Sequence, residues 1–139
     1  MIEWDEFSDK VSAMTPDTEK ARSLLQLVEL REKDLAAKKE EFVTLIIEGY
    51  YEIVKEIITG IMAVDGWKTV SHELLVGYLA KHYNEFSPLE IYLIDQLRKI
   101  RNDIDYRGVM VSVEYLRRNK NDILNIIFKL KQILEVKLQ

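Results

Sequence analysis

The segment from Arg101 to Tyr106 (Arg-Asn-Asp-Ile-Asp-Tyr) gathers side chains that could bind an anion or move a proton. It brings a guanidinium, an amide, two carboxylates and a phenol into a single short stretch of chain. A guanidinium can hold a phosphate group through two parallel hydrogen bonds. An unperturbed phenol has a pKa of about 10, so it can donate a hydrogen bond but accepts a proton poorly at neutral pH. This segment is therefore the first place in the sequence where we expect a functional site.

A helix is expected to position this segment. The sequence Ser87-Pro88-Leu89-Glu90 has the pattern of a capping box with proline at the first helical position. Gly108 is placed to end the same helix. Apolar residues recur along it at i, i+4 and i+7 spacing and predict one buried face, formed by Leu89, Leu93, Leu97, Ile100 and Ile104. The segment from Arg101 to Tyr106 would then form the C-terminal end of this helix.

A second face of the predicted helix runs through Ile94, Arg98, Arg101 and Asp105, which stack along one line. In one interpretation, Arg101 and Asp105 form a surface ion pair worth only about a few tenths of a kcal/mol. In the other, these four residues contact a partner subunit and the arginines line a cleft at the exposed end of the contact. The sequence leaves both interpretations open.

The rest of the chain also predicts helices separated by short breaks, because glycine and proline are scarce. Helices are expected to begin at Thr15-Pro16, near Lys39, at Ser71 and near Ser112. The Lys39–Val64 helix carries an apolar stripe so wide that it should be central, with Gly49 as a close-packing point. A short additional helix is expected within residues 1–15, through Trp4, Phe7 and Val11. The prediction is a single all-α domain over residues 1–139, an antiparallel bundle of four to five helices.

Composition limits the classes of protein and site that this chain can represent. The 139 residues are 47% hydrophobic and 32% charged, which is typical of one folded, soluble domain. The absence of cysteine excludes disulfides and thiolate metal sites. We expect no cofactor and no metal, and the acidic N-terminus together with the lack of a long apolar run predicts a cytoplasmic protein without membrane attachment. The net charge of −4 argues against a general nucleic-acid coat but leaves room for a local basic groove.

The order of predicted elements is similar to that of the HEPN domain, an all-α bundle that is widespread in prokaryotes and typically dimeric. The resemblance covers residues 17–138 and rests mainly on Leu97-Arg98-Lys99-Ile100-Arg101-Asn102, followed by a loop that contains glycine. The break at residues 66–71, the helix start Ser71-His72-Glu73-Leu74-Leu75 and the final amphipathic helix support it. The resemblance implies a homodimer related to metal-independent ribonucleases, which are often toxins paired with a small nucleotidyltransferase.

The family signature is an arginine, a polar residue and then a histidine a few positions on, contributed by both subunits to a shared cleft. Arg101 and Asn102 match the first two positions, and Tyr106 stands where the histidine is expected. The resemblance therefore implies Arg101, Asn102 and Tyr106 as the candidate catalytic residues. Because a phenol is a poor general base, the resemblance implies binding of a nucleotide or RNA phosphate with reduced or no catalysis. The alternatives are a metal-independent endoribonuclease and a protein-interaction partner of a nucleotidyltransferase.

Other basic residues extend the predicted nucleotide- or RNA-binding surface. The candidates are Arg98, Arg101, Arg107, Arg117 and Arg118. The last two begin the final helix and fit equally well with a solvated helix surface. The two histidines, His72 and His82, lie at helix ends, where capping or solvation is a more common role than catalysis.

Overall fold

The structure is a computed structural model that describes residues 2–139, and it confirms an all-α helical bundle. Its helices are α1 (Thr18–Ala37), α2 (Val43–Asp65), α3 (His72–His82), α4 (Pro88–Arg107) and α5 (Val113–Lys137), with the short 3-10 helix η1 (Glu40–Phe42) before α2. Within the described residues there is also one small antiparallel sheet, made of β1 (Val11–Ala13) and β2 (Trp67–Thr69).

Helix α2 is the centre of the bundle, as its wide apolar stripe predicts. It packs against α1, α3, α4 and α5, and most of its side chains are buried. Gly49 is the expected close-packing point, because a Cβ atom there would lie 2.6 Å from Cδ2 of Leu35 on α1. Neither α2 nor any other helix in residues 2–139 has an apolar stretch long enough to cross a membrane.

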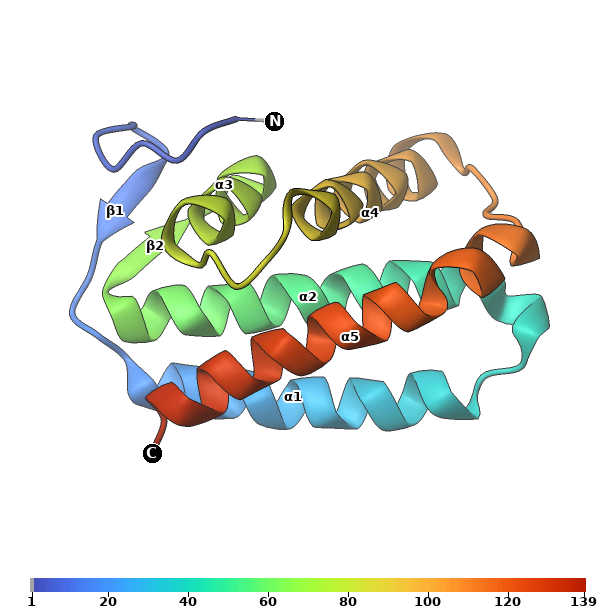
Figure 1. Cartoon of the computed structure of the whole chain (residues 1–139), viewed down its shortest axis with the longest axis horizontal. Helices are drawn as coiled ribbons and strands as arrows, with labels where there is room; N and C mark the ends of the chain where they lie inside the picture. Colours follow the sequence, from blue (N-terminus) through green and yellow to red (C-terminus); the bar gives the residue numbers. More distant parts are fainter. Residues whose placement is uncertain (1) are drawn as a thin grey trace.

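The helices form two groups around α2. Helices α1 and α5 lie along one side of α2, and α3 and α4 lie on the other (Figure 1). Neighbours α1 and α2 are antiparallel, but α5 runs in the same direction as α2 (Figure 1). Contacts at both ends agree: the amide N–H of Val111, just before α5, donates to Thr44 Oγ1 at the start of α2, and Lys137 pairs with Asp65 where both helices end. A parallel pair is possible because α2 and α5 are not consecutive in the chain, with α3 and α4 between them.

Local signals define the ends of the helices. Ser71, Ser87 and Ser112 each accept a hydrogen bond from a first-turn amide, and Ser87 with Glu90 completes the expected capping box. Gly66 and Gly108 end α2 and α4 with φ of 92° and 64°, the left-handed region that favours glycine.

Two details of the predicted helices need correction. Helix α1 begins at Thr18 and is capped by Asp17, so Thr15-Pro16 precedes the helix instead of starting it. Leu89 is 80% exposed, although its spacing placed it on the buried face of α4. It lies in the first turn, and the residues of α4 that are buried begin at Ile91.

The N-terminal segment is not the short helix that its apolar residues predicted. Residues 11–13 form β1, which pairs with β2 through Val11 opposite Thr69 and Ala13 opposite Trp67. Trp4 is buried and packs edge-on against Tyr78 of α3, with ring centroids 4.8 Å apart. A Cβ atom on Gly77 would lie 2.6 Å from the carbonyl oxygen of Ile2, so this glycine lets the N-terminal segment lie directly on α3. Trp4 therefore belongs to the hydrophobic core, whereas Phe7 is 88% exposed.

Candidate functional site

The start of α3 and the C-terminal half of α4 border an open cleft of about 280 Å³, which we call the α3–α4 cleft. It contains four of the residues singled out in the sequence, Arg98, Arg101, Asn102 and Tyr106, and places His72 among them. The complete lining is Val70, Ser71, His72, Glu73, Arg98, Arg101, Asn102 and Tyr106.

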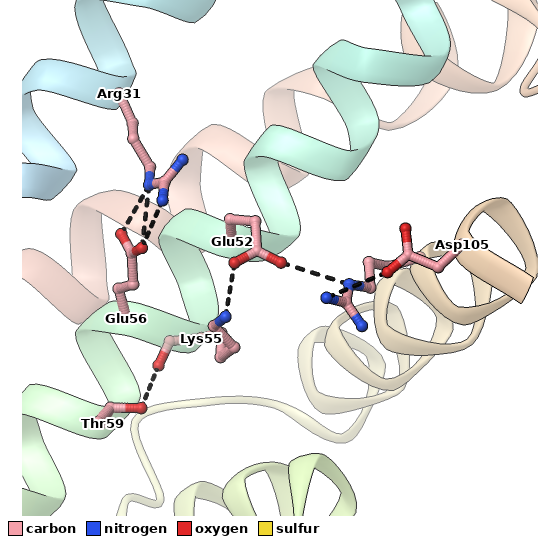
Figure 2. A network of polar contacts seen from close by, with 7 residues as sticks. Arg31, Glu52, Lys55, Glu56, Thr59 and Asp105 are labelled. Atoms are coloured by element: carbon pink, nitrogen blue, oxygen red, sulfur yellow. Dashed lines mark hydrogen bonds and ion pairs between the residues drawn. The ribbon is translucent and has the colours of Figure 1, made fainter.

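Arg101 is held in place by carboxylates from two helices. Its Nη2 lies 3.1 Å from Oδ2 of Asp105, one turn along α4, which confirms the predicted ion pair. Its Nε lies 3.3 Å from Oε1 of Glu52 on α2, and this Glu52 also pairs with Lys55 (Figure 2). The Nε atom is buried and lacks the alignment for a hydrogen bond. The guanidinium is thus fixed in orientation, while Nη1 has no partner among residues 2–139.

Arg98 is the more buried of the two arginines. Its Nε donates to Oδ1 of Asp95 at 2.9 Å, and its Nη1 lies 4.0 Å from Oε1 of Glu73. Burial favours the neutral form of Asp95, but the hydrogen bond and charge of Arg98 outweigh it and hold the pKa of this carboxyl below its usual range. Asp95 therefore stays ionised and orients Arg98, whose Nη atoms make no hydrogen bond within the described chain.

The carboxylates below Arg101 repel one another. Burial, together with a hydrogen bond and like charge from Asp105, raises the pKa of Glu48 above its usual value. The charge of Arg101 acts in the opposite direction and favours ionised Glu48. Carboxylates thus lie along the inner side of Arg101, and Glu73, which pairs with Arg98, is the one carboxylate among the residues that line the cleft.

His72 is the residue of the cleft that sequence reasoning did not select. It is the first residue of α3, and its ring lies 5.9 Å from the ring of buried Tyr51, measured between centroids. Burial and the positive charges of Lys55 and Arg101 lower the pKa of His72, so the imidazole is neutral at pH 7. A neutral imidazole beside two arginines is available as a proton acceptor.

The N-terminus of α3 adds a further favourable field for an anion. Ser71 caps this helix by accepting from the amide N–H of Leu74 at 3.3 Å. The first amide N–H groups of a helix have no intrahelical acceptor and carry the positive end of the helix dipole. Here they lie at the wall of the cleft formed by His72 and Glu73, opposite the arginines of α4.

Tyr106 stands at the exposed edge of the cleft. It is 82% exposed and makes no hydrogen bond to any residue in 2–139, which allows it to stack on a flat group or donate a hydrogen bond from its hydroxyl. No set of three or more acidic or histidine side chains in the described residues is arranged to hold a metal ion.

The remaining basic candidates lie outside the cleft. Arg107 pairs with Asp103 at 3.5 Å, and Arg117 pairs with Glu40 of η1. Arg118 is exposed on α5 and does not line the cleft. The cleft therefore contains two of the five arginines that the sequence suggested for nucleotide or RNA binding.

The predicted subunit contact also changes in part. Ile94 is 0% exposed and Arg98 is buried, because α4 packs against both α2 and α3 within one chain. These two residues are therefore unavailable to a partner, whereas Arg101 and Asp105 reach the surface. In the face defined by Ile94, Arg98, Arg101 and Asp105, the first two residues pack inside the chain.

No protein-family model, curated protein or solved structure matches this chain.

Proposed function

We propose that the chain binds a phosphate group of a nucleotide or of RNA in the α3–α4 cleft. The observation that carries the proposal is the convergence of Arg98, Arg101 and Asn102 with the N-terminus of α3 on one open cleft. Guanidinium groups, amide side chains and helix N-termini are the common ligands of phosphate in proteins. The proposed HEPN-like character of the chain agrees with this use of Arg101 and Asn102.

The carboxylates around the arginines bear on the strength of binding. Much of the positive charge of Arg98 and Arg101 is compensated by Asp95, Glu52 and Asp105. The cleft therefore offers an anion hydrogen-bond donors in fixed positions, but little net positive charge. We therefore expect modest affinity and a shallow dependence on salt, because few counterions are released when few phosphates are contacted. Tyr106 would add stacking on a base next to the bound phosphate.

Replacing Arg101 by lysine is the direct test. Lysine keeps the positive charge but loses the two-pronged geometry, so the affinity for AMP is expected to fall about tenfold. The measurement is an NMR titration of labelled protein with AMP, following the side-chain signals of Asn102 and the arginines.

The matched control is Arg107→Lys, on the same helix but paired with Asp103 outside the cleft. It should bind AMP like the wild type. Equal affinities in all three proteins, or shifts confined to residues far from α3 and α4, would exclude the cleft as the phosphate site.

A second candidate, metal-independent RNA cleavage, is favoured by the position of His72. In this reaction neutral His72 would accept the proton of a ribose 2′-hydroxyl as its oxygen bonds to phosphorus. The bond from phosphorus to the 5′-oxygen then breaks, and the leaving oxygen receives a proton from water or the Tyr106 hydroxyl. The products are a 2′,3′-cyclic phosphate and a free 5′-hydroxyl. Arg101 would stabilise the charge on the phosphate oxygens.

This candidate predicts a specific pH dependence. Cleavage of single-stranded RNA in the presence of chelator should fall as the pH drops through the lowered pKa of His72, below about 6.5, because the protonated ring cannot accept a proton. His72→Ala should abolish it, and His82→Ala, at the other end of α3, should leave it unchanged. Intact RNA after long incubation with the wild type would leave only the binding function.

A further inference from the structure

A second open hollow lies away from the α3–α4 cleft, on the opposite side of α2. Helices α1 and α5 lie close together at one end of the bundle and diverge toward the other (Figure 1). Between them is an open hollow of about 660 Å³, which we call the α1–α5 hollow. Its floor and walls are mainly apolar and include Leu35, Ile46, Ile53, Leu124 and Ile127. This volume is within the range of about 300 to 1,000 Å³ found for small-molecule sites.

Two ion pairs bridge the walls of the hollow. Lys131 of α5 binds Glu32 of α1 at 2.9 Å, and Arg117 of α5 pairs with Glu40 of η1. The hydrogen bond from Lys131 to Glu32 raises the pKa of this lysine, so the lysine stays charged at neutral pH. Glu32 and Glu40 line the hollow, and their negative charges are thus compensated by Lys131 and Arg117, which do not line it.

The lysines that line the hollow are compensated differently. Lys38 pairs with Asp34 at 3.0 Å. Lys33 on the α1 wall and Lys120 on the α5 wall have no carboxylate within ion-pair distance in residues 2–139, and both are exposed. An apolar hollow with two uncompensated cations on opposite walls is complementary to a molecule with an apolar body and an anionic end.

Tyr50 supplies a polar group inside the apolar part. Its side chain is buried, and burial raises the pKa of its hydroxyl, which stays protonated and can donate. The hydroxyl has no hydrogen-bond partner among residues 2–139. It is nevertheless accessible to solvent, because in these residues Nε of Arg101 is the only side-chain nitrogen or oxygen that is both fully buried and without a hydrogen bond. A buried tyrosine hydroxyl normally finds a partner, and here the open side is the hollow.

We propose that the α1–α5 hollow binds a linear alkyl carboxylate of medium chain length. The alkyl chain lies against Ile46, Ile53 and Ile127, and the carboxylate lies between Lys33 and Lys120 with the Tyr50 hydroxyl as an additional donor. None of the residues that line this hollow lines the α3–α4 cleft. Each methylene that enters the hollow should strengthen binding about fourfold.

Titration with decanoate, below its micelle concentration, tests the proposal. We expect saturable binding that shifts the methyl signals of Ile46, Ile53 and Ile127, with octanoate about fifteenfold weaker and uncharged decanol also weaker. Ala36→Phe, which fills the hollow from the exposed end of α1, should abolish these shifts. Lys33→Glu combined with Lys120→Glu should weaken decanoate by tenfold or more and decanol hardly at all.

The matched control reverses two exposed lysines far from the hollow, Lys68 and Lys81, and so gives the same net charge. It should bind decanoate like the wild type. The proposal is overturned if decanoate shifts no methyl group of the hollow, or if Ala36→Phe binds it normally. It is also overturned if Ala36→Phe turns a dimeric wild type into a monomer, because the hollow would then be covered by a second copy of the chain.

Discussion

Ile94→Ala is expected to lower the free energy of unfolding by about 2 to 5 kcal/mol, the usual cost of removing a buried isoleucine side chain. Ile94 is completely buried, with α2 and α3 both packed against α4, so the substitution leaves a cavity inside one chain. Urea denaturation at two protein concentrations measures the effect. The loss should be the same at both concentrations, because the cavity does not lie between subunits.

The control for this substitution is Leu89→Ala on the same helix. Leu89 is apolar and close in size, but it is exposed, so its removal should change stability by less than about 0.5 kcal/mol. A variant Ile94→Ala that keeps wild-type stability but loses an oligomeric state would restore the interpretation of this face as a subunit contact.

Asp65→Ala is expected to cost about 2 to 3 kcal/mol, because one carboxylate serves three donors. Its Oδ2 accepts from the hydroxyls of Tyr78 and Tyr83, the latter at 2.8 Å, and its Oδ1 accepts from Lys137 at 2.7 Å. The carboxylate thus joins the ends of α2, α3 and α5. Without it, the buried hydroxyl of Tyr78 loses its acceptor. Chemical denaturation at pH 7 measures the difference from wild type.

The contribution of Asp65 should depend on pH with a definite sign. Burial alone would raise the pKa of Asp65, but the hydrogen bonds from Lys137, Tyr78 and Tyr83 outweigh it and hold the pKa below its usual value. The folded state therefore favours the ionised form. Its stabilising effect is fully present above the unfolded pKa of about 3.9 and is lost as the pH falls through the lower folded pKa. The stability difference between wild type and Asp65→Ala should accordingly narrow below about pH 4.

Asp34→Ala provides a comparison for Asp65, because Asp34 pairs with Lys38 at an exposed position. It should cost less than about 1 kcal/mol. Similar small losses for both substitutions, or a difference between wild type and Asp65→Ala that does not change between pH 7 and pH 3, would contradict the assigned role of Asp65.

Most helix ends were predictable because their signals are local. The capping hydroxyls of Ser71, Ser87 and Ser112 and the left-handed Gly66 and Gly108 act on residues within one turn of themselves, so a short stretch of sequence contains the whole cause. The strands β1 and β2 were missed because each is only three residues long and forms only when distant parts of the chain meet.

Burial on α4 was only partly predictable. Its leucine spacing identified one buried face, but α4 packs against two helices, so the face through Ile94 and Arg98 is buried as well. The number of neighbours around a helix is a tertiary property that its own periodicity does not contain. Arg98 was assigned to a subunit contact because its buried partner, Asp95, can be recognised only when both are seen inside the bundle.

The candidate site was predicted on one side and missed on the other. Arg101 and Asn102 were identified from their position at the end of α4, and Tyr106 from the resemblance to a family motif. His72 was set aside because a histidine at a helix end is more often capping or solvated than catalytic. Nothing in the sequence places the start of α3 beside the end of α4. The cap at Ser71 identified the start of that helix but not its neighbour.

Helix α2 separates the two candidate sites and serves both. Tyr50 and Ile53 form the floor of the α1–α5 hollow, while the next residues around the helix, Tyr51 and Glu52, contact His72 and Arg101 at the α3–α4 cleft. A helix packed on all sides shifts as a unit, because close-packed interiors transmit displacement. An occupant that moved α2 from one side would therefore change affinity on the other, and thermodynamic linkage requires the change to be equal in both directions. Ligands bound at both proposed sites would share one coupling free energy.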